Sequence, residues 1–132
     1  MIHEVSLDAG VLLIPLEGEI PADEYARLLA LGSHLLETTD GPIAICALVH
    51  QEAGTDPLLR KAVADALRHH RHRIVGVALC GPRVRQRVVA KIVATMAGLG
   101  PITSFDAEDQ ALAWAHAQVQ AARARGRTHA GR

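Results

Sequence analysis

The sequence predicts a single α/β domain with a mixed, mainly parallel five-stranded sheet and four helices, in the order β-β-α-β-α-β-α-β-α. Short apolar runs alternate with helical patterns along the chain, which is typical of parallel strands joined by helices. A length of 132 residues with 49% apolar residues suits one buried core. We expect residues 1–122 to form this domain and residues 123–132, rich in Arg, Ala and Gly, to form a flexible tail.

The N-terminal part is predicted to contain a hairpin followed by a helix. Residues 2–7 and 11–16 have strand patterns, and residues 8–10 between them are a tight-turn sequence. A helix then begins at Pro21, where the missing N–H costs nothing, and ends at residues 40–42, Asp-Gly-Pro. Its acidic first turn suits the helix dipole.

The rest of the chain is predicted to repeat a strand–helix step. Buried strands are expected at residues 43–49 and 74–80, and a short strand ends at Phe105. Asp56 and Asp106 are placed to cap the helices that follow two of these strands.

The helix predicted after Gly81-Pro82 contains two series of residues spaced four apart, one apolar and one basic. Its predicted buried stripe consists of Val84, Val88, Ile92 and Met96, widened by Val89 and Val93. A second series of basic residues lies on another face: Arg83, Arg87 and Lys91.

The net charge of zero hides a strong segregation of charge along the chain. Residues 1–40 hold eight acids and one base, whereas residues 60–91 hold nine bases and one acid. Solvated helix faces explain this pattern, and the alternative is a docking surface for an acidic partner or for another copy of the chain. That surface would include Arg83, Arg87 and Lys91. No aromatic residue is interleaved with the bases, so nucleic acid is not an expected partner.

Several classes of site are disfavoured by the residues present. Cys46 and Cys80 lie inside apolar runs, which predicts buried, reduced thiols and no thiolate nucleophile. There is no phosphate-binding glycine motif and no Gly-x-Ser-x-Gly elbow. No signal peptide pattern and no membrane span are evident, so we expect a cytoplasmic location.

Three histidines close together, His69, His70 and His72, raise the question of a metal site. Neighbouring positions on a helix point in different directions, and no acid or thiol lies within three residues of them. Their place near a helix end suits the helix dipole instead. We therefore expect neither a metal nor a cofactor.

The segment between the third strand and the second helix holds the most interesting polar residues. His50 follows a central strand, where open α/β sheets place ligands, and Glu52 could pair with it as a general acid–base couple. A polar strand end explains the same residues. Thr55 follows Gly54 and sits beside the helix start, where a phosphate would meet free N–H groups, although the Asp56 carboxylate competes for them.

A series of short motifs runs in order through the chain. It comprises the hairpin, Leu16-x-Gly18-x-Ile20, the Pro-led first helix, Gly41-Pro42 before the third strand, and Phe105-Asp106 followed by Ala111-Leu112-Ala113-Trp114. Over about residues 1–120 this order resembles the SpoIIAA-like (STAS) domain family, a branch of which is likened to CRAL-TRIO domains. The resemblance implies a small, non-enzymatic α/β domain.

In that family, anti-sigma-factor antagonists dock on a partner kinase and are switched by phosphorylation at the start of the helix after the third strand. The resemblance makes Thr55 the candidate for this role, although the Asp-Ser-Ser-Gly loop of antagonists is absent here. His50, Glu52, Gly54 and Asp56 would complete the partner loop.

The expected function is therefore that of a STAS-type regulatory or protein-interaction module, similar to an anti-sigma-factor antagonist. Its partner would be an anti-sigma kinase or a sigma-regulatory protein, with a homodimer as a further expectation. The alternative is a domain that binds a lipid or an anionic small molecule, as the CRAL-TRIO likeness implies. An enzyme acting through His50 and Glu52 has the least support.

Overall fold

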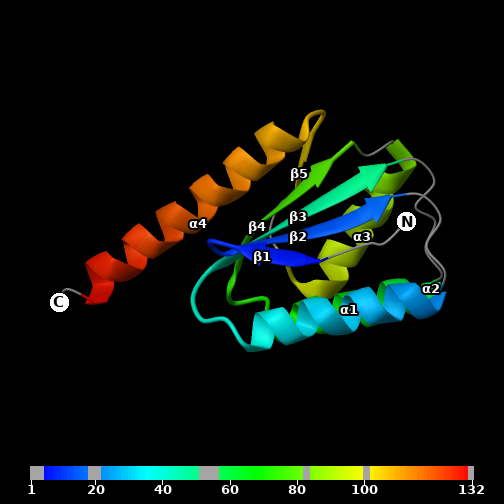
Figure 1. The fold of residues 1–132 in the computed structure, drawn as a ribbon, viewed down its shortest axis with the longest axis horizontal. Coiled ribbons are helices and arrows are strands. Elements are labelled where there is room, and N and C mark those ends of the chain that lie inside the picture. The colour runs from blue at the N-terminus through cyan, green and yellow to red at the C-terminus, as the bar shows by residue number, and fades with distance from the viewer. Residues whose placement is uncertain (1–4, 18–21, 51–56, 82–83, 100–101, 131–132) are drawn as a thin grey trace.

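A computed structural model describes residues 5–17, 22–50, 57–81, 84–99 and 102–130 of the chain. Its elements follow the predicted order and form one five-stranded sheet with four helices (Figure 1). They are β1 (Ser6–Asp8), β2 (Val11–Glu17), α1 (Ala22–Glu37), β3 (Ile43–His50), α2 (Pro57–His69), β4 (Ile74–Cys80), α3 (Val84–Ala97), β5 (Ile102–Phe105) and α4 (Glu108–Ala130). The predicted fold class is confirmed.

The hairpin at the start of the sheet depends on a two-residue turn. Ala9 and Gly10 both have positive φ angles, 49° and 84°, as a type I′ turn requires. Gly10 is also required for space, because a Cβ atom there would lie 2.8 Å from Val119 Cγ1 of α4. The turn makes β1 antiparallel to β2, whereas β2 to β5 are parallel neighbours.

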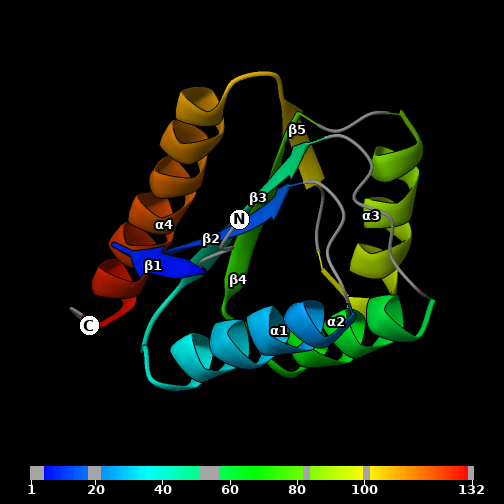
Figure 2. The same cartoon turned by 45° about the vertical axis from the view of Figure 1, so that its right-hand side comes forward.

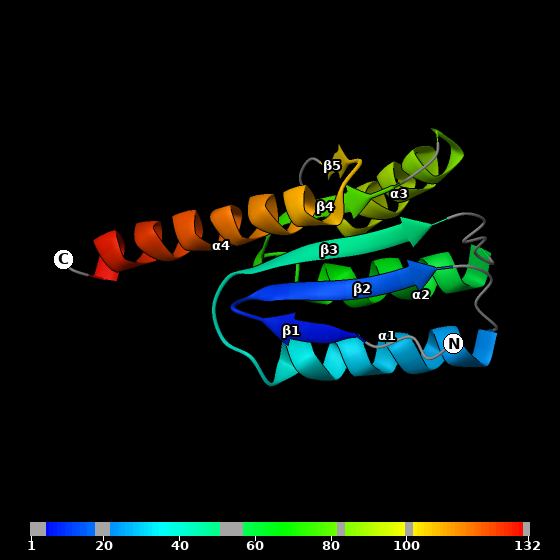
Figure 3. The same cartoon turned by 45° about the horizontal axis from the view of Figure 1, so that its top comes forward.

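The helices divide unequally between the two faces of the sheet. The strands lie in sequence order, and right-handed crossovers between them place α1, α2 and α3 on one face. Helix α4 lies alone across the opposite face, mainly over β3 and β4 (Figures 2 and 3). Its last turns extend past the edge of the sheet (Figure 1).

Each face has its own apolar core. The cluster on the α4 side contains Val11, Ala44, Cys46, Leu48, Ala78, Cys80, Ala111, Ala115 and Val119. The cluster on the other side contains Leu12, Leu36, Ile43, Ile45 and Val77. Along β2 and β3 successive side chains alternate between the two clusters, as a pleated strand dictates. A register shift near the start of β4 interrupts this alternation, and both Val75 and Gly76 face α4. Both faces of the sheet are therefore covered, as the continuous apolar runs predicted.

The two scarce aromatic residues meet on the α4 side. The ring centroids of Phe105 and Trp114 are 5.8 Å apart, and the Trp114 ring also covers Gly76 of β4. A Cβ atom at Gly76 would lie 2.7 Å from Trp114 Cη2. Glycine at this position therefore makes the space in which the indole ring packs.

The predicted buried stripe of α3 is wrong for its described C-terminal half. Ile92 and Met96 are 49% and 45% exposed, whereas Ala94 and Ala97 are buried. Helix α3 packs beside α2 and over the short edge strand β5, so only a narrow side of it meets the core. Two alanines three residues apart fill that side and allow a close approach, which leaves the larger side chains in solvent.

The ends of α3 and α4 also refine the sequence prediction. Helix α3 ends in a Schellman motif, in which Leu99 N donates to Ala94 O and Gly98 N donates to Thr95 O, with Gly98 at a φ of 74°. The first helical bond of α4 joins Ala111 N to Ala107 O, so the cap position lies one residue after the predicted Asp106.

Helix α4 continues through most of the segment that was expected to form a tail, since it ends at Ala130. The flexibility of that segment stays a prediction. Within the described residues, no helix is both long enough and apolar enough to span a membrane.

Candidate interaction surface

The loop singled out from the sequence begins at the carboxyl edge of the sheet. Strands β2 to β5 are parallel, so their carboxyl ends share one edge, where Glu17 and His50 are paired in register. The predicted place of His50 at the end of a central strand is thus confirmed. Its side chain, together with Glu52, Gly54, Thr55 and Asp56, lies outside the described residues. Their roles remain predictions.

The predicted basic series on α3 is described only in part. Arg83 lies outside the described residues, and Arg87 lies within α3 with an undescribed side chain. Lys91 is exposed one turn further along the helix. Helical spacing places Arg87 and Lys91 on one side of α3, as expected.

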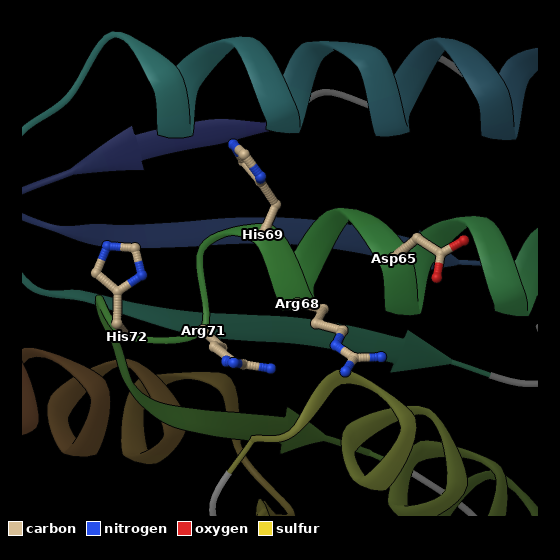
Figure 4. A pocket seen from close by; sticks show the side chains of 5 residues that line it. All are labelled: Asp65, Arg68, His69, Arg71 and His72. Atoms are coloured by element: carbon tan, nitrogen blue, oxygen red, sulfur yellow. The ribbon is translucent and has the colours of Figure 1, made fainter.

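A second basic group lies at the opposite edge of the sheet, where α2 ends. Asp65, Arg68, His69, Arg71 and His72 line a shallow, open depression there (Figure 4). Arg68 and Arg71 extend toward the end of α3, whereas His69 points away from them toward α1 (Figure 4). The sequence predicted a helix end at this place, but it did not show that the end borders a basic hollow.

The two arginines of this depression, Arg68 and Arg71, form no ion pair with any other described residue. Arg71 lies over the turn that ends α3, because a Cβ atom at Gly98 would be 3.5 Å from Arg71 Cδ. Arg68 is in the last turn of α2. Both cations therefore lie near the negative ends of helix dipoles, which stabilises them there.

The three histidines have different environments. His69 and His72 are exposed, whereas His70 is only 7% exposed and meets the His69 ring edge-on, with centroids 4.9 Å apart. Burial lowers the pKa of His70, and the positive charges of His69, Arg73 and His72 lower it further, against an opposite effect of Glu37. Within the described residues no three metal-binding side chains come together.

Arg73, the last residue of the basic run, has a structural role. Its guanidinium donates hydrogen bonds to three main-chain carbonyls, one in the last turn of α1 and two in the segment that follows it. Nη1 donates to Leu36 O at 2.6 Å, Nε donates to Gly41 O at 3.1 Å, and Nη2 donates to Thr39 O. It therefore satisfies the Leu36 carbonyl, which the end of α1 leaves without an intrahelical partner, and two carbonyls of the segment that follows the helix. The cation also complements the negative end of the α1 dipole.

The two cysteines are free and buried, as predicted. Burial raises the pKa of Cys46 to about 11, with a further contribution from Cys80, and burial also raises the pKa of Cys80. Both thiols are therefore protonated at neutral pH and are poor nucleophiles.

Sequence reasoning missed two of these features. The first is the set of hydrogen bonds from Arg73 to three carbonyls, which join segments far apart in the chain. In the sequence, the one indication of this role is a basic residue directly before a predicted strand. The exposure of Ile92 and Met96 could have been suspected from the alanines on the other side of α3, since alanine permits closer packing than valine.

Comparison with known proteins supports the resemblance inferred from the motifs. A family described as SpoIIAA-like matches residues 11–116. No curated protein matches the chain. Among solved structures, the chain is similar to an anti-sigma-factor antagonist (STAS) domain protein from Planctomyces limnophilus, with a TM-score of 0.57 and 10% identity over 84% of this chain and 96% of that chain. That likeness shows a shared fold, and the family match covers well over half of the sequence. The chain belongs to the SpoIIAA-like family.

Proposed function

We propose that this protein is a non-catalytic regulatory module that acts by binding a protein partner, in the manner of an anti-sigma-factor antagonist. The match to the SpoIIAA-like family over residues 11–116 carries the proposal. The partner would be an anti-sigma kinase or another sigma-regulatory protein. Two protonated, buried thiols and an open, basic surface fit a binding module better than an enzyme.

The partner would contact the loop from His50 to Asp56 and the basic side of α3 with Arg83, Arg87 and Lys91. Position supports this choice, because His50 ends a central strand and α2 begins at Pro57. A phosphate on Thr55 would lie beside the first N–H groups of α2 and the positive end of its dipole. Phosphorylation there would change the charge of the partner loop.

Site-specific photo-crosslinking in the native host tests this function. Benzoylphenylalanine in place of Ala53 is expected to capture one defined protein. The same group in place of Ala117, which is exposed on α4, is the matched control and is expected to capture none. Capture of the same proteins from both positions, or of none from the loop, would count against the proposal.

Phosphorylation is tested separately on protein purified from that host. Intact mass spectrometry is expected to show a fraction with one added phosphate, which disappears in Thr55→Ala. Thr55→Glu is expected to weaken the crosslink from position 53. A phosphate that persists in Thr55→Ala would remove the role proposed for Thr55.

The alternative of a lipid or anionic small-molecule site has less support. The depression at the end of α2 is open and lined by polar side chains, unlike the enclosed apolar cavities that hold lipids. Native mass spectrometry of the purified protein decides the question, since a retained lipid would appear as a defined added mass.

A further inference from the structure

Three arginines close together in the chain use their N–H groups in different ways. Arg73 directs its guanidinium to three main-chain carbonyls at and after the end of α1. The side chains of Arg68 and Arg71 form no hydrogen bond or ion pair with any other described residue. Each guanidinium presents several N–H donors in a fixed fork. The depression at the end of α2 therefore contains two cations whose donors are available to a ligand.

The helix ends beside these arginines do not need their donors. Leu67 O and Arg68 O accept main-chain N–H groups from the turn after α2. The Schellman motif that ends α3 satisfies Ala94 O and Thr95 O in the same way. Capping of the last carbonyls thus explains the position of Arg73 but not the positions of the other two arginines.

The depression also keeps positive charge after the helix dipoles are counted. Each helix end supplies roughly −0.5 of an elementary charge, so the ends of α2 and α3 together offset about one of the two guanidinium charges. Asp65 lines the depression as well, but its carboxylate is directed along α2 and not toward Arg68 or Arg71 (Figure 4). An anion between the two guanidinium groups is therefore attracted by the nearest charges.

The orientation of the two side chains indicates which anion fits. Both arginines extend toward the end of α3, and the guanidinium of Arg71 is directed toward Arg68 (Figure 4). Arg71 passes over Gly98, where a Cβ atom would lie 3.5 Å from its Cδ and 3.8 Å from its Nη1. A phosphate group offers three terminal oxygens and can accept from two forks at once, whereas the two oxygens of a carboxylate are filled by one fork.

We propose that Arg68 and Arg71 bind the phosphate group of a phosphate monoester at the end of α2. The depression is open, so the rest of the ligand would extend into solvent. A phosphorylated small molecule and a phosphomonoester lipid headgroup share this chemistry. The inference goes beyond the proposed function, because the depression lies at the amino edge of the sheet and the loop after His50 begins at the carboxyl edge.

The test follows the two side chains directly. ¹⁵N spectra of the full-length protein report the arginine Nε–H groups and the main-chain amides during titration with phenyl phosphate at about pH 7.5, where the monoester is mainly a dianion. Phenylacetate is the matched carboxylate. We expect shifts confined to Arg68, Arg71 and the adjacent ends of α2 and α3. Phenyl phosphate is expected to bind at least ~10-fold more tightly than phenylacetate.

Three double variants separate a built site from general attraction. Arg68→Gln with Arg71→Gln removes both forks and is expected to weaken phenyl phosphate at least ~10-fold. Arg68→Lys with Arg71→Lys keeps the charge without the forks and should recover only part of that loss. Arg123→Gln with Arg125→Gln removes the same charge from exposed positions on α4 and should leave the affinity unchanged. Circular dichroism confirms that each variant is folded.

Vesicle sedimentation separates the two sources of the phosphate group. Phosphatidylcholine vesicles containing phosphatidic acid, a phosphomonoester, are compared with vesicles containing phosphatidylglycerol, a phosphodiester, at the same surface charge. Sedimentation with phosphatidic acid alone, lost in the glutamine variant of Arg68 and Arg71, would assign a lipid headgroup. Binding of phenyl phosphate without sedimentation would assign a free phosphorylated molecule.

Four results would overturn the proposal. They are equal affinities for phenyl phosphate and phenylacetate, shifts centred on another part of the domain, equal losses in the α2 and α4 glutamine variants, and full affinity in the lysine variant. Absence of binding to both phenyl phosphate and phosphatidic acid vesicles would overturn it too. None of these outcomes changes the crosslink expected from position 53, so the inference can fail while the proposed function stands.

Discussion

The two faces of the sheet differ in the size of the side chains that cover them. The α4 side is built largely from small residues: Ala44, Cys46, Ala78, Cys80, Ala111 and Ala115. The opposite side uses larger ones: Leu12, Leu36, Ile43 and Ile45. Small side chains let a single helix lie close to the strands, whereas larger ones fill the space under three helices.

This difference separates the roles of the two faces. On the α4 side Ala111, Ala115 and Val119 are fully buried, and no large apolar side chain of the described residues is as exposed as Ile92 or Met96. On the other side α3 keeps apolar residues in solvent, and α2 ends in exposed bases. The α4 face therefore contributes mainly to stability, whereas the outer surface of α2 and α3 leaves large apolar and basic side chains exposed.

Gly76 is where the close packing of the α4 side can be broken most directly. A Cβ atom there would lie 2.7 Å from Trp114 Cη2 and 3.1 Å from Cζ3, and the indole is held against Phe105. Gly76→Val is therefore expected to lower the free energy of unfolding by about 3 kcal/mol. Urea unfolding followed by circular dichroism measures the change.

Two further variants identify the cause of that loss. Gly32→Ala in α1, where an added Cβ atom meets nothing within 4 Å, is expected to raise stability by about 0.5–1 kcal/mol. Gly76→Ala combined with Trp114→Leu should lose less than the sum of the two single changes. Strict additivity would show that contact between Gly76 and the ring is not the cause.

On the opposite side of the sheet, we expect the next largest loss of stability when Arg73 is replaced. Arg73→Ala leaves the carbonyls of Leu36, Thr39 and Gly41 without their donor and is expected to lower the free energy of unfolding by about 2 kcal/mol. Arg73→Lys should recover only part, because an ammonium cannot reach all three oxygens with the same geometry.

Arg68→Ala is the matched control for this change, since it removes an exposed base from the same stretch of chain. It is expected to alter stability by less than about 0.5 kcal/mol. If both arginine variants lose the same amount, general electrostatics and not the carbonyl contacts explain the role of Arg73.

A smaller effect concerns pH, because a single proton is involved. Burial first, then nearby positive charge, lowers the pKa of His70 below its usual 6.5 in the folded protein. The unfolded chain therefore binds that proton more readily, and the stability from the neutral imidazole is lost as pH falls below about 6.5. Unfolding free energies measured from pH 7 to pH 5 should decrease.

His70→Gln should flatten that decrease, since glutamine has no proton to gain in this range. Arg68→Gln, two residues earlier and exposed, should keep the slope of the natural protein. A slope that is unchanged in His70→Gln would assign the pH dependence to other groups.

Local signals in the sequence were enough to predict most of the fold. Strand β4 has the predicted bounds, and the turn at Ala9 and Gly10 has the predicted compact form. These features depend on residues adjacent in the chain, where turn chemistry and periodicity act directly. The family came from the order of several short motifs, which the family match then confirmed.

Features that depend on distant residues could not be predicted. Glycine in a strand signals a close approach, but nothing in the sequence identifies Trp114 as the group that approaches Gly76. On α3, the large apolar side chains of Ile92 and Met96 were predicted to be buried, but both are exposed. Which side of the helix is buried depends on how closely α3 packs against α2 and β5. The small side chains of Ala94 and Ala97 allow this close packing and are the ones that are buried.

The smallest expected effect is on the outer surface of α3, where it sharpens the contrast between the faces. Ile92→Gln and Met96→Gln are expected to change stability by less than about 0.5 kcal/mol, because both side chains already meet water. Val119→Ala, at a fully buried position on α4, should cost about 1–3 kcal/mol in the same assay. A loss at Ile92 as large as that at Val119 would show that the pair is needed for folding, and the exposed apolar surface of α3 would then need no partner to explain it.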